Sequence, residues 1–462
     1  MSRTGSSGRL FDGSPGARTF AHVLANTAAA GVVNYTMWFA LTFWVFLRTQ
    51  SVFATGMIGG LFLALTAGLA FWFGSLVDHH SKKRVMLGSS LASFGFYAAS
   101  AVLVATTPEP DFADVGEPRL WLLIGLVMLG VIAGNLRTIA LPTLVTALIP
   151  SDRRDRANGL VGMATGIGFL TTSVISGLLV AWGGMTAALA FALVLTLAAF
   201  AHLRLVRVEE PRSDDQTAQA DGRRRIDIRG TIAVIAGVPG LFALILFATF
   251  NNFLGGVFMA LMDAYGLSLM PVQAWGLLWG VISLAFIASG LVIARTGLGT
   301  NPVRTLLIVN LVAWSAAAVF TVQSSILLLA VGCAVWMFLG PWAEAAEHTT
   351  LQRVVPYARQ GRVFGFAQSV EQAASPLTAF LIGPLTQFLV IPFMSDGAGA
   401  RAIGGWFGTG PERGIALVFT LAGITGVIVT LLALRSRPYR RLSAAYAASS
   451  AEANGPGPGR AA

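Results

Sequence analysis

The sequence predicts an all-α membrane protein in which twelve transmembrane helices form two pseudo-symmetric six-helix bundles. Hydrophobic residues make up 55% of the 462 residues and charged residues only 11%, whereas an ordinary soluble domain carries about 25% charged residues. Twelve apolar stretches are long enough to cross the hydrocarbon core, which takes roughly 20 helical residues. A long polar segment separates the first six stretches from the last six.

The twelve stretches are apolar on all sides, which favours helices over strands of alternating character. The polar segment 207–229 follows the sixth stretch and cannot bury enough apolar surface to fold. The tails, 1–18 and 437–462, are expected to be disordered and cytoplasmic. The predicted domains are therefore two bundles, 19–206 and 230–436, joined by a cytoplasmic linker. The predicted spans are 20–46, 52–76, 85–106, 119–148, 157–182, 184–206, 231–259, 272–295, 302–322, 324–350, 362–394 and 413–435.

The distribution of charge predicts the orientation. If the N-terminus and alternate loops face one side, that side collects 26 of the 31 Lys and Arg residues. Such an excess is typical of the cytoplasmic side, so both termini are predicted to be cytoplasmic and the protein to lie in the inner membrane. The loop 107–118 on the other side carries four acids and no base. The net charge of +10 therefore reflects membrane topology and not a nucleic-acid partner.

The two halves also contain an internal repeat. The segment 149–159 (IPSDRRDRANG) aligns with 355–365 (VPYARQGRVFG), and each lies in a loop between the fourth and fifth predicted helices of its half. Two equivalent six-helix halves around a central path are expected of a rocking transporter. Three pairs match at an offset of 206: Pro150 with Pro356, Arg156 with Arg362, and Gly159 with Gly365.

The loop after the second predicted helix, GSLVDHHSKKRVML (74–87), resembles a signature of the major facilitator superfamily. The corresponding loop of the second half, 290–304, keeps two glycines and a base but has Ala294 at the acidic position. The two repeated segments resemble the branch of macrolide-efflux proteins and enterobactin exporters. The segment 172–177 (TSVISG) lacks the proline that drug antiporters of the family often carry there. The matching residues of the signature are Gly74, Asp78, Lys82, Lys83 and Arg84.

The resemblance implies the major facilitator fold and a gating role for the signature loop. A carboxylate favours the positive N-terminal end of a helix. By resemblance, Asp78 meets the start of the eleventh predicted helix near Gly361–Val363 and holds the cytoplasmic side shut. The alternative is a solvated loop that only keeps positive charge inside.

Charges at membrane depth are costly and usually face a cavity or a partner. Arg137 on the fourth predicted helix and Glu344 on the tenth occupy nearly equivalent places in the two halves, as binding residues or as a structural ion pair. Glu371 is the first candidate for a protonatable coupling residue. The further candidates are Glu347 and His348, which could instead pair with Arg353, Arg359 or Arg362 at the interface, and Asp263 near the outer end of the seventh helix.

Two clusters combine amides with aromatic rings at membrane depth, on helices that line the cavity in the family that this chain resembles. Aromatic walls with a few polar groups suit a bulky amphipathic ligand, although each residue alone could serve packing. The candidate cavity residues are Asn34, Tyr35 and Trp38 in the first half, and Phe250, Asn251 and Asn252 in the second.

Several features argue against other protein classes. The sequence has no G-x-x-x-x-G-K-[ST] phosphate loop, and its only lysines are Lys82 and Lys83, so we expect no ATP-driven pump. No motif of an enzyme or a metal site is present, and Cys333 is the one cysteine, expected to be a buried packing residue. We therefore expect a monomeric, non-enzymatic transporter without cofactors, energised by the proton gradient.

The predicted function is proton-coupled efflux of amphipathic small molecules, such as drugs, macrolides or siderophores, by alternating access. Proton-coupled nutrient uptake is the alternative within transport, because the sequence hardly discriminates direction. A membrane receptor of the same fold that does not transport is the alternative from another class.

Overall fold

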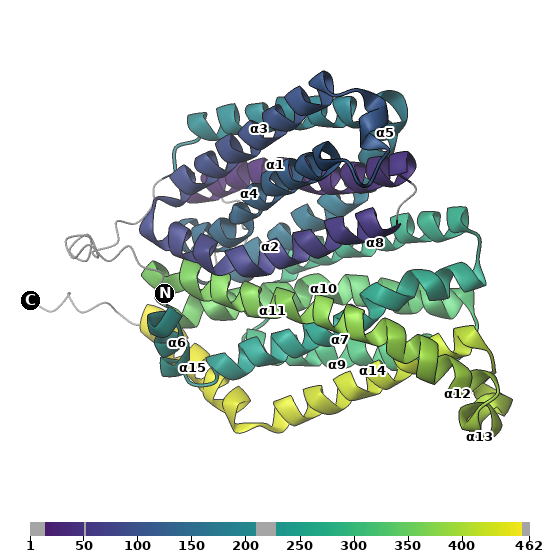
Figure 1. Cartoon of the computed structure of the whole chain (residues 1–462). Helices are drawn as coiled ribbons and strands as arrows, with labels where there is room; N and C mark the ends of the chain where they lie inside the picture. Colours follow the sequence, from purple (N-terminus) through teal and green to yellow (C-terminus); the bar gives the residue numbers. More distant parts are fainter. Residues whose placement is uncertain (1–13, 50–51, 209–227, 455–462) are drawn as a thin grey trace, which may run out of the picture. The chain divides into compact units, whose positions relative to one another are not determined.

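The computed structural model describes residues 14–49, 52–208 and 228–454, and in this part of the chain all regular structure is helical (Figure 1). Eleven of the described helices are long and apolar enough to cross a membrane. The helices are α1 (Pro15–Thr49), α2 (Val52–His79), α3 (Lys82–Thr106), η1 (Glu109–Phe112), α4 (Pro118–Leu148), α5 (Arg154–Leu205), α6 (Ile228–Gly237), α7 (Leu241–Leu269), α8 (Val272–Thr296), α9 (Pro302–Val319), α10 (Ile326–Val354), α11 (Tyr357–Leu385), the π-helical η3 (Thr386–Val390), α12 (Ile391–Ser395), α13 (Ala398–Phe407), α14 (Pro411–Arg435) and α15 (Arg437–Asn454).

The count of eleven differs from the predicted twelve because α5 covers two predicted spans, 157–182 and 184–206. This element is 52 residues long and consists of two helices joined at a kink, where Gly183 and Gly184 have non-helical backbone angles. Gly184 has a φ of 59°, a left-handed conformation that glycine adopts without steric cost. The two spans are therefore separated by a tight glycine turn inside one continuous element.

The seventh predicted span, 231–259, was wrong in its boundaries. Residues Ile228–Gly237 form the short helix α6, and the long helix α7 begins only at Leu241. Gly240, with a φ of 85°, breaks the helix between them. At about 1.5 Å per residue α6 is too short to cross the hydrocarbon core, so α7 alone provides this span.

The chain divides into two compact units that do not follow the two halves of the sequence. Unit 1 comprises 1–149, 163–226 and 357–369, and unit 2 comprises 150–162, 227–356 and 370–462. The chain thus passes from one unit to the other inside α5 and again inside α11. Each of these helices begins in one unit and continues in the other.

Each unit has its own apolar core. In unit 1, α4 packs along α3, α1 and α2, and in unit 2, α9 and α10 pack along α14 and α8. The core of unit 1 includes Met37, Leu41 and Val127, which are fully buried. The core of unit 2 is built around Trp314 and includes Cys333, which is buried as predicted.

The C-terminal tail contains more structure than we expected. Residues 437–454 form α15, which packs against α7, α9, α10 and α14 of unit 2. Leu442 on its inner face is 2% exposed, and the guanidinium of Arg353 lies 5.9 Å from the Tyr446 ring centroid. Apolar and aromatic residues on one face therefore anchor a helix of polar overall composition. Most of the predicted linker, 209–227, lies outside the described residues.

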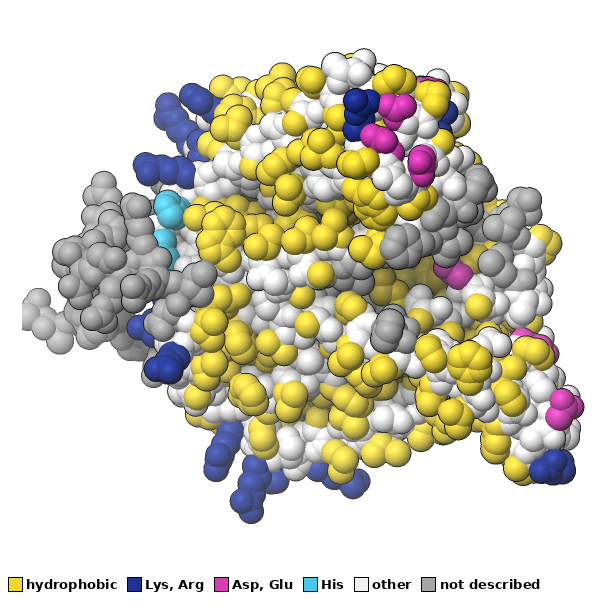
Figure 2. All heavy atoms as spheres, viewed as in Figure 1, with side chains coloured by type: hydrophobic (Ala, Val, Ile, Leu, Met, Phe, Trp, Pro, Cys, Tyr) yellow, Lys and Arg dark blue, Asp and Glu magenta, His cyan; other side chains and the backbone are white. Residues whose placement is uncertain are grey.

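Basic side chains gather at one end of the helices in each unit, as Figure 2 shows in dark blue. In unit 1 this end carries Lys82, Lys83 and Arg84, and in unit 2 it carries α15 and the α10–α11 turn. We call it the basic end of each unit. The acids of the predicted loop 107–118 lie at the other end of unit 1, where Arg119 contacts Asp111 at 2.7 Å.

Candidate functional site

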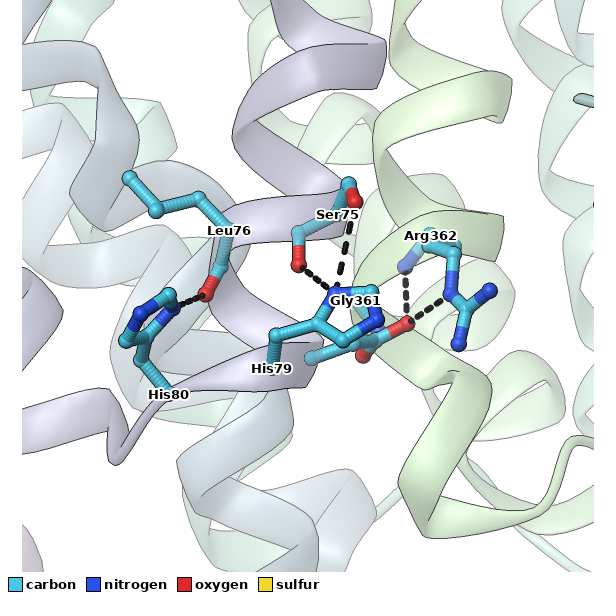
Figure 3. A network of polar contacts seen from close by, with 7 residues as sticks. Ser75, Leu76, His79, His80, Gly361 and Arg362 are labelled. Carbon is cyan, nitrogen blue, oxygen red and sulfur yellow. Dashed lines mark hydrogen bonds and ion pairs between the residues drawn. The ribbon is translucent and has the colours of Figure 1, made fainter. Parts of the chain in front are cut away.

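Asp78, at the end of α2, accepts hydrogen bonds from the beginning of α11. Its Oδ1 lies 2.6 Å from the backbone nitrogen of Gly361, and its Oδ2 lies 2.8 Å from that of Arg362. The Arg362 Nε also donates to Oδ2 at 3.2 Å. The Asp78 side chain is 1% exposed. Figure 3 shows Gly361 and Arg362 facing the end of α2.

This contact places a carboxylate against the second turn of α11. Oriented backbone N–H groups and the helix dipole both favour a carboxylate near the first turns of a helix. Arg362 adds a charge-assisted bond. The carboxylate is thus bound on both oxygens, and the contact joins α2 to the 357–369 segment within unit 1. We call it the Asp78 latch.

Glycines allow α2 and α11 to approach closely enough for this latch. A Cβ on Gly74 would collide with the carbonyl oxygen of Gly361 and reach within 3.1 Å of the Arg362 Cα. A Cβ on Gly365 would lie 2.5 Å from the carbonyl oxygen of Ala70. The glycine of the signature loop and the glycine of the repeated segment therefore meet at one backbone crossing.

The remaining signature residues surround the latch differently. Ser81 caps α3 by accepting from the Arg84 backbone nitrogen at 3.3 Å. The Lys82 Nζ lies 4.8 Å from the centroid of the Tyr357 ring, and the Lys83 Nζ donates to the Arg204 carbonyl at 3.2 Å. The Arg84 side chain is exposed. Lys82 therefore contacts the α11 segment directly.

Unit 2 contains a similar contact, but the acid is supplied by the start of α5 and not by the loop after α8, which corresponds to the signature loop. Asp155, at the start of α5, accepts from the backbone nitrogen of Leu298 with Oδ2 at 2.8 Å. Leu298 follows α8, in the loop whose acidic position is Ala294. Gly297 has a φ of 74°, and a Cβ there would meet Asp155. We call this contact the Asp155 latch.

The sequence analysis missed Asp155. It lies inside the repeated segment, which we aligned only through its proline, arginine and glycine. The loss of the acid at Ala294 was visible, and a search for a compensating acid in the opposing repeated segment would have found Asp155. The neighbouring Asn158 strengthens this contact region, because its amide lies 2.8 Å from the Thr349 hydroxyl and 3.0 Å from the Gln352 amide oxygen.

Three carboxyl groups of unit 2 lie near one another on α10 and α11. Glu344 and Glu347 come from α10 and Glu371 from α11, and all three are half-buried. The side chains of Glu347 and Glu371 lie against each other, and Glu344 is close enough for its charge to act on both. The interfacial arginines expected as alternative partners of Glu347 and His348 stay a prediction, and the group that lies against Glu347 is another acid, Glu371.

A hydrogen bond between two carboxyl groups requires that one of them carry a proton. Two carboxylates in contact repel each other, so one stays protonated while the other ionises. One oxygen of Glu371, Oε1, is buried and has no hydrogen-bond partner among the described residues.

Arg137 lies apart from these acids, inside unit 1. Its guanidinium donates to the Asn26 amide oxygen at 2.6 Å, to the Met86 carbonyl at 3.2 Å and to the Ser90 hydroxyl. The residue is 2% exposed. Neutral acceptors on two helices, α1 and α3, thus satisfy the charge, and this arrangement joins both helices to α4 within the unit.

The candidate cavity residues fall into two groups. In unit 1, Asn34 packs on Gly134 of α4, and Tyr35 lies beside Gly168 of α5. The Trp38 ring contacts Phe62, and its Nε1 is buried without a hydrogen-bond partner among the described residues.

The unit 2 candidates contact residues of their own unit. Asn251 accepts from the Trp314 Nε1 at 2.6 Å, and Phe250 packs against the core. Asn252 donates to the Ala248 carbonyl at 3.1 Å. Asp263 accepts from the Trp275 Nε1 at 2.9 Å, so its carboxyl is held by a neutral donor within unit 2.

Comparison with known proteins identifies the family. The profile of the Major Facilitator Superfamily matches residues 23–379. This chain belongs to the Major Facilitator Superfamily, a family of membrane transporters and not of enzymes. The recognition from the signature loop is thereby confirmed, as is the predicted all-helical membrane fold.

Curated relatives of this transporter are similar over most of its length. Macrolide efflux protein A of Streptococcus pyogenes is 23% identical over 375 residues, which cover 78% of this chain and 88% of the relative. Enterobactin exporter EntS of Escherichia coli O1:K1 / APEC is 25% identical over 366 residues, which cover 77% and 80%. These names match the branch that the repeated segments resemble.

Solved structures confirm the fold of the transporter. The human organic anion transporter MFSD10 (TETRAN) has a TM-score of 0.69 at 15% identity and covers 93% of this chain and 100% of its own. The proton:xylose symporter XylE has a TM-score of 0.64 at 12% identity and covers 93% and 99%. At these identities the likeness concerns the fold alone.

Proposed function

We propose that this transporter exports amphipathic small molecules in exchange for protons, with the Glu347–Glu371 pair as the coupling site. The observation that carries the proposal is the contact between the half-buried carboxyl groups of Glu347 on α10 and Glu371 on α11. Export is favoured because the relatives that cover most of the chain are named as efflux proteins. The substrate class follows from the same names and from the aromatic residues around Trp38.

The coupling step needs a group that binds a proton in one conformation and releases it in another. A carboxyl pair does this when a conformational change separates the two groups or admits water, because the shared proton then loses its second acceptor. Substrate that binds near the pair favours its deprotonated state, so substrate and proton alternate. Among the described residues no ion pair with Lys or Arg neutralises the pair, so protonation governs its charge.

The two latches supply the conformational part of the proposal. We propose that the basic end faces the cytoplasm and that the Asp78 and Asp155 latches hold the cytoplasmic side closed. Both latches involve a helix that belongs partly to each unit, α11 in the Asp78 latch and α5 in the Asp155 latch. Breaking the latches therefore releases these two helices for the opposite state. Each state then exposes the carboxyl pair to a different compartment.

The coupling role is tested by transport in proteoliposomes with a radiolabelled macrolide as the probe. Wild-type protein should drive macrolide accumulation against a gradient when a pH difference is imposed, and nigericin should abolish it. Glu371→Gln should lose pH-driven accumulation but retain counterflow, the exchange of labelled for unlabelled macrolide, which needs no net proton movement. Glu347→Gln should behave in the same way.

Asp263→Asn is the matched control, because its carboxyl is bound by Trp275 and not by another acid. This variant should retain pH-driven accumulation. Gradient dependence that persists in Glu371→Gln would remove the pair from coupling. A pH difference that drives macrolide only in the direction of proton flow would favour uptake over export.

A further inference from the structure

A groove on unit 1 has no role in the latches or in the carboxyl pair. It lies between α2, α3 and α4, is hollow over about 490 Å³, and has an almost entirely apolar lining. This volume is in the range of ~300–1,000 Å³ that small-molecule sites occupy. Its walls include Trp72, Phe73 and Phe96, and its mouth at the basic end carries His80 and Arg84.

The groove exists because α2 and α3 make few contacts with each other and the residues that line the space between them are small. α3 packs closely along α4, whereas α2 and α3 touch at few points. Gly88, Ala92 and Ala133 line the space between them. A Cβ on Gly88 would meet no atom within 4 Å. The hollow is therefore open space, and the adjoining side chains do not fill it.

The groove is open to the membrane. Trp72 is 46% exposed and Leu129 is 38% exposed, and the three helices that form the groove are candidate membrane spans. A hydrocarbon chain that enters this groove exchanges one apolar environment for another, so close contact with the walls is the source of its affinity.

In contrast to the apolar walls, the mouth of the groove carries a positive charge and a polar ring. The Arg84 guanidinium is exposed and makes no hydrogen bond or ion pair with the residues that the structure describes. The His80 Nδ1 lies 3.2 Å from the Leu76 carbonyl, which holds the ring at the mouth (Figure 3). Guanidinium groups bind phosphate through paired, charge-assisted hydrogen bonds.

We propose that this groove binds one anionic phospholipid from the leaflet at the basic end, with an acyl chain between α2, α3 and α4 and the phosphate at Arg84 and His80. The distance between Arg84 and the apolar walls determines how the lipid is placed. The apolar walls begin where α3 begins, within one helical turn of Arg84, as a headgroup followed by a chain requires.

Lipid occupancy has a consequence for the latch nearby. Arg84 and Asp78 flank the same α2–α3 turn, so a phospholipid bound there ties this turn to the membrane interface. A conformation that moves α2 relative to α3 must release the lipid or carry it along.

Native mass spectrometry of the delipidated full-length transporter tests the proposal. With limiting lipid, wild-type protein should retain one phosphatidylglycerol about fivefold more readily than phosphatidylcholine, the effect expected of one Lys or Arg at an anionic surface. Arg84→Gln should remove this preference while phosphatidylcholine binding persists. Arg18→Gln, an exposed arginine of α1 outside the groove, should leave it intact.

The chain position is tested by filling the groove. Gly88→Phe should reduce retention of both lipids at least tenfold. Gly95→Phe is the matched control, because Gly95 is also exposed on α3, also has open space at its Cβ, and does not line the groove. Ala92→Leu provides a second filling variant if Gly88→Phe fails to fold.

Four outcomes would overturn the proposal. Wild-type protein could bind phosphatidylglycerol and phosphatidylcholine equally, or Gly88→Phe and Ala92→Leu could retain lipid as the wild type does. Inorganic phosphate could displace phosphatidylglycerol, which would indicate a site for a free anion. Displacement by the transported macrolide with equal loss in Gly88→Phe transport would instead assign the groove to substrate.

Discussion

At the scale of single residues, Asp78 has the most clearly defined task. Asp78→Asn keeps the size of the side chain but replaces one accepting oxygen by a donor, which faces the N–H groups of α11. Hydrogen bonds to a charged group contribute about 1.5–3 kcal/mol, so the ratio of closed to open protein should fall roughly tenfold or more. Labelling of Val363→Cys, a position that is 1% exposed beside the latch, by a membrane-impermeant maleimide should accelerate accordingly.

Asp152→Asn is the control for this measurement. Asp152 is an acid of the same end whose side chain is 68% exposed and lies 3.7 Å from Arg153. Exposed ion pairs contribute about 0–1 kcal/mol, so labelling should change little. Equal labelling rates for Asp78→Asn and the parent would show that the latch does not hold the closed state.

At the scale of elements, the crossing of α2 and α11 should tolerate no side chain. Gly74→Ala and Gly365→Ala each place a methyl group against the backbone of the other helix, and overpacking of this kind costs about 1–3 kcal/mol. We expect a lower unfolding temperature for both variants. Gly68→Ala, exposed on the same α2 with nothing within 4 Å of its Cβ, should unfold at or above the parent temperature. If the Gly74 and Gly365 variants unfold at the parent temperature, α2 and α11 can separate enough to accept a methyl group without loss of stability.

Elements also show where sequence patterns are sufficient and where they fail. Long apolar runs predicted most spans, because the hydrocarbon core requires them whatever the packing. The division of α6 from α7 depends on one left-handed glycine, Gly240, which hydropathy does not detect. The helix α15 was hidden because its composition is polar and only a narrow face, including Leu442, is buried.

At the scale of the whole molecule, the parts of the candidate site that lie within one short motif were predictable, and those that depend on distant segments were harder to predict. The position of Asp78 beside Gly361 followed from a signature within one loop and a family resemblance. The Glu347–Glu371 pair depends on a contact between distant segments, which a single sequence does not report, whereas Asp155 could have been found by comparing the two repeated segments. Arg137 looked like a binding residue by depth alone, whereas Asn26, Met86 and Ser90 satisfy its charge inside unit 1.

The division of α5 and α11 between the units makes a test of cooperation possible. If both latches break in one alternating-access transition, Asp155→Asn alone should accelerate maleimide labelling of Val363→Cys, although Asp155 belongs to unit 2 and Val363 to unit 1. In the double variant with Asp78→Asn, the two fold-changes should multiply, because both residues bias one equilibrium. If the latches open separately, Asp155→Asn should leave labelling at Val363→Cys unchanged, and the double variant should match Asp78→Asn.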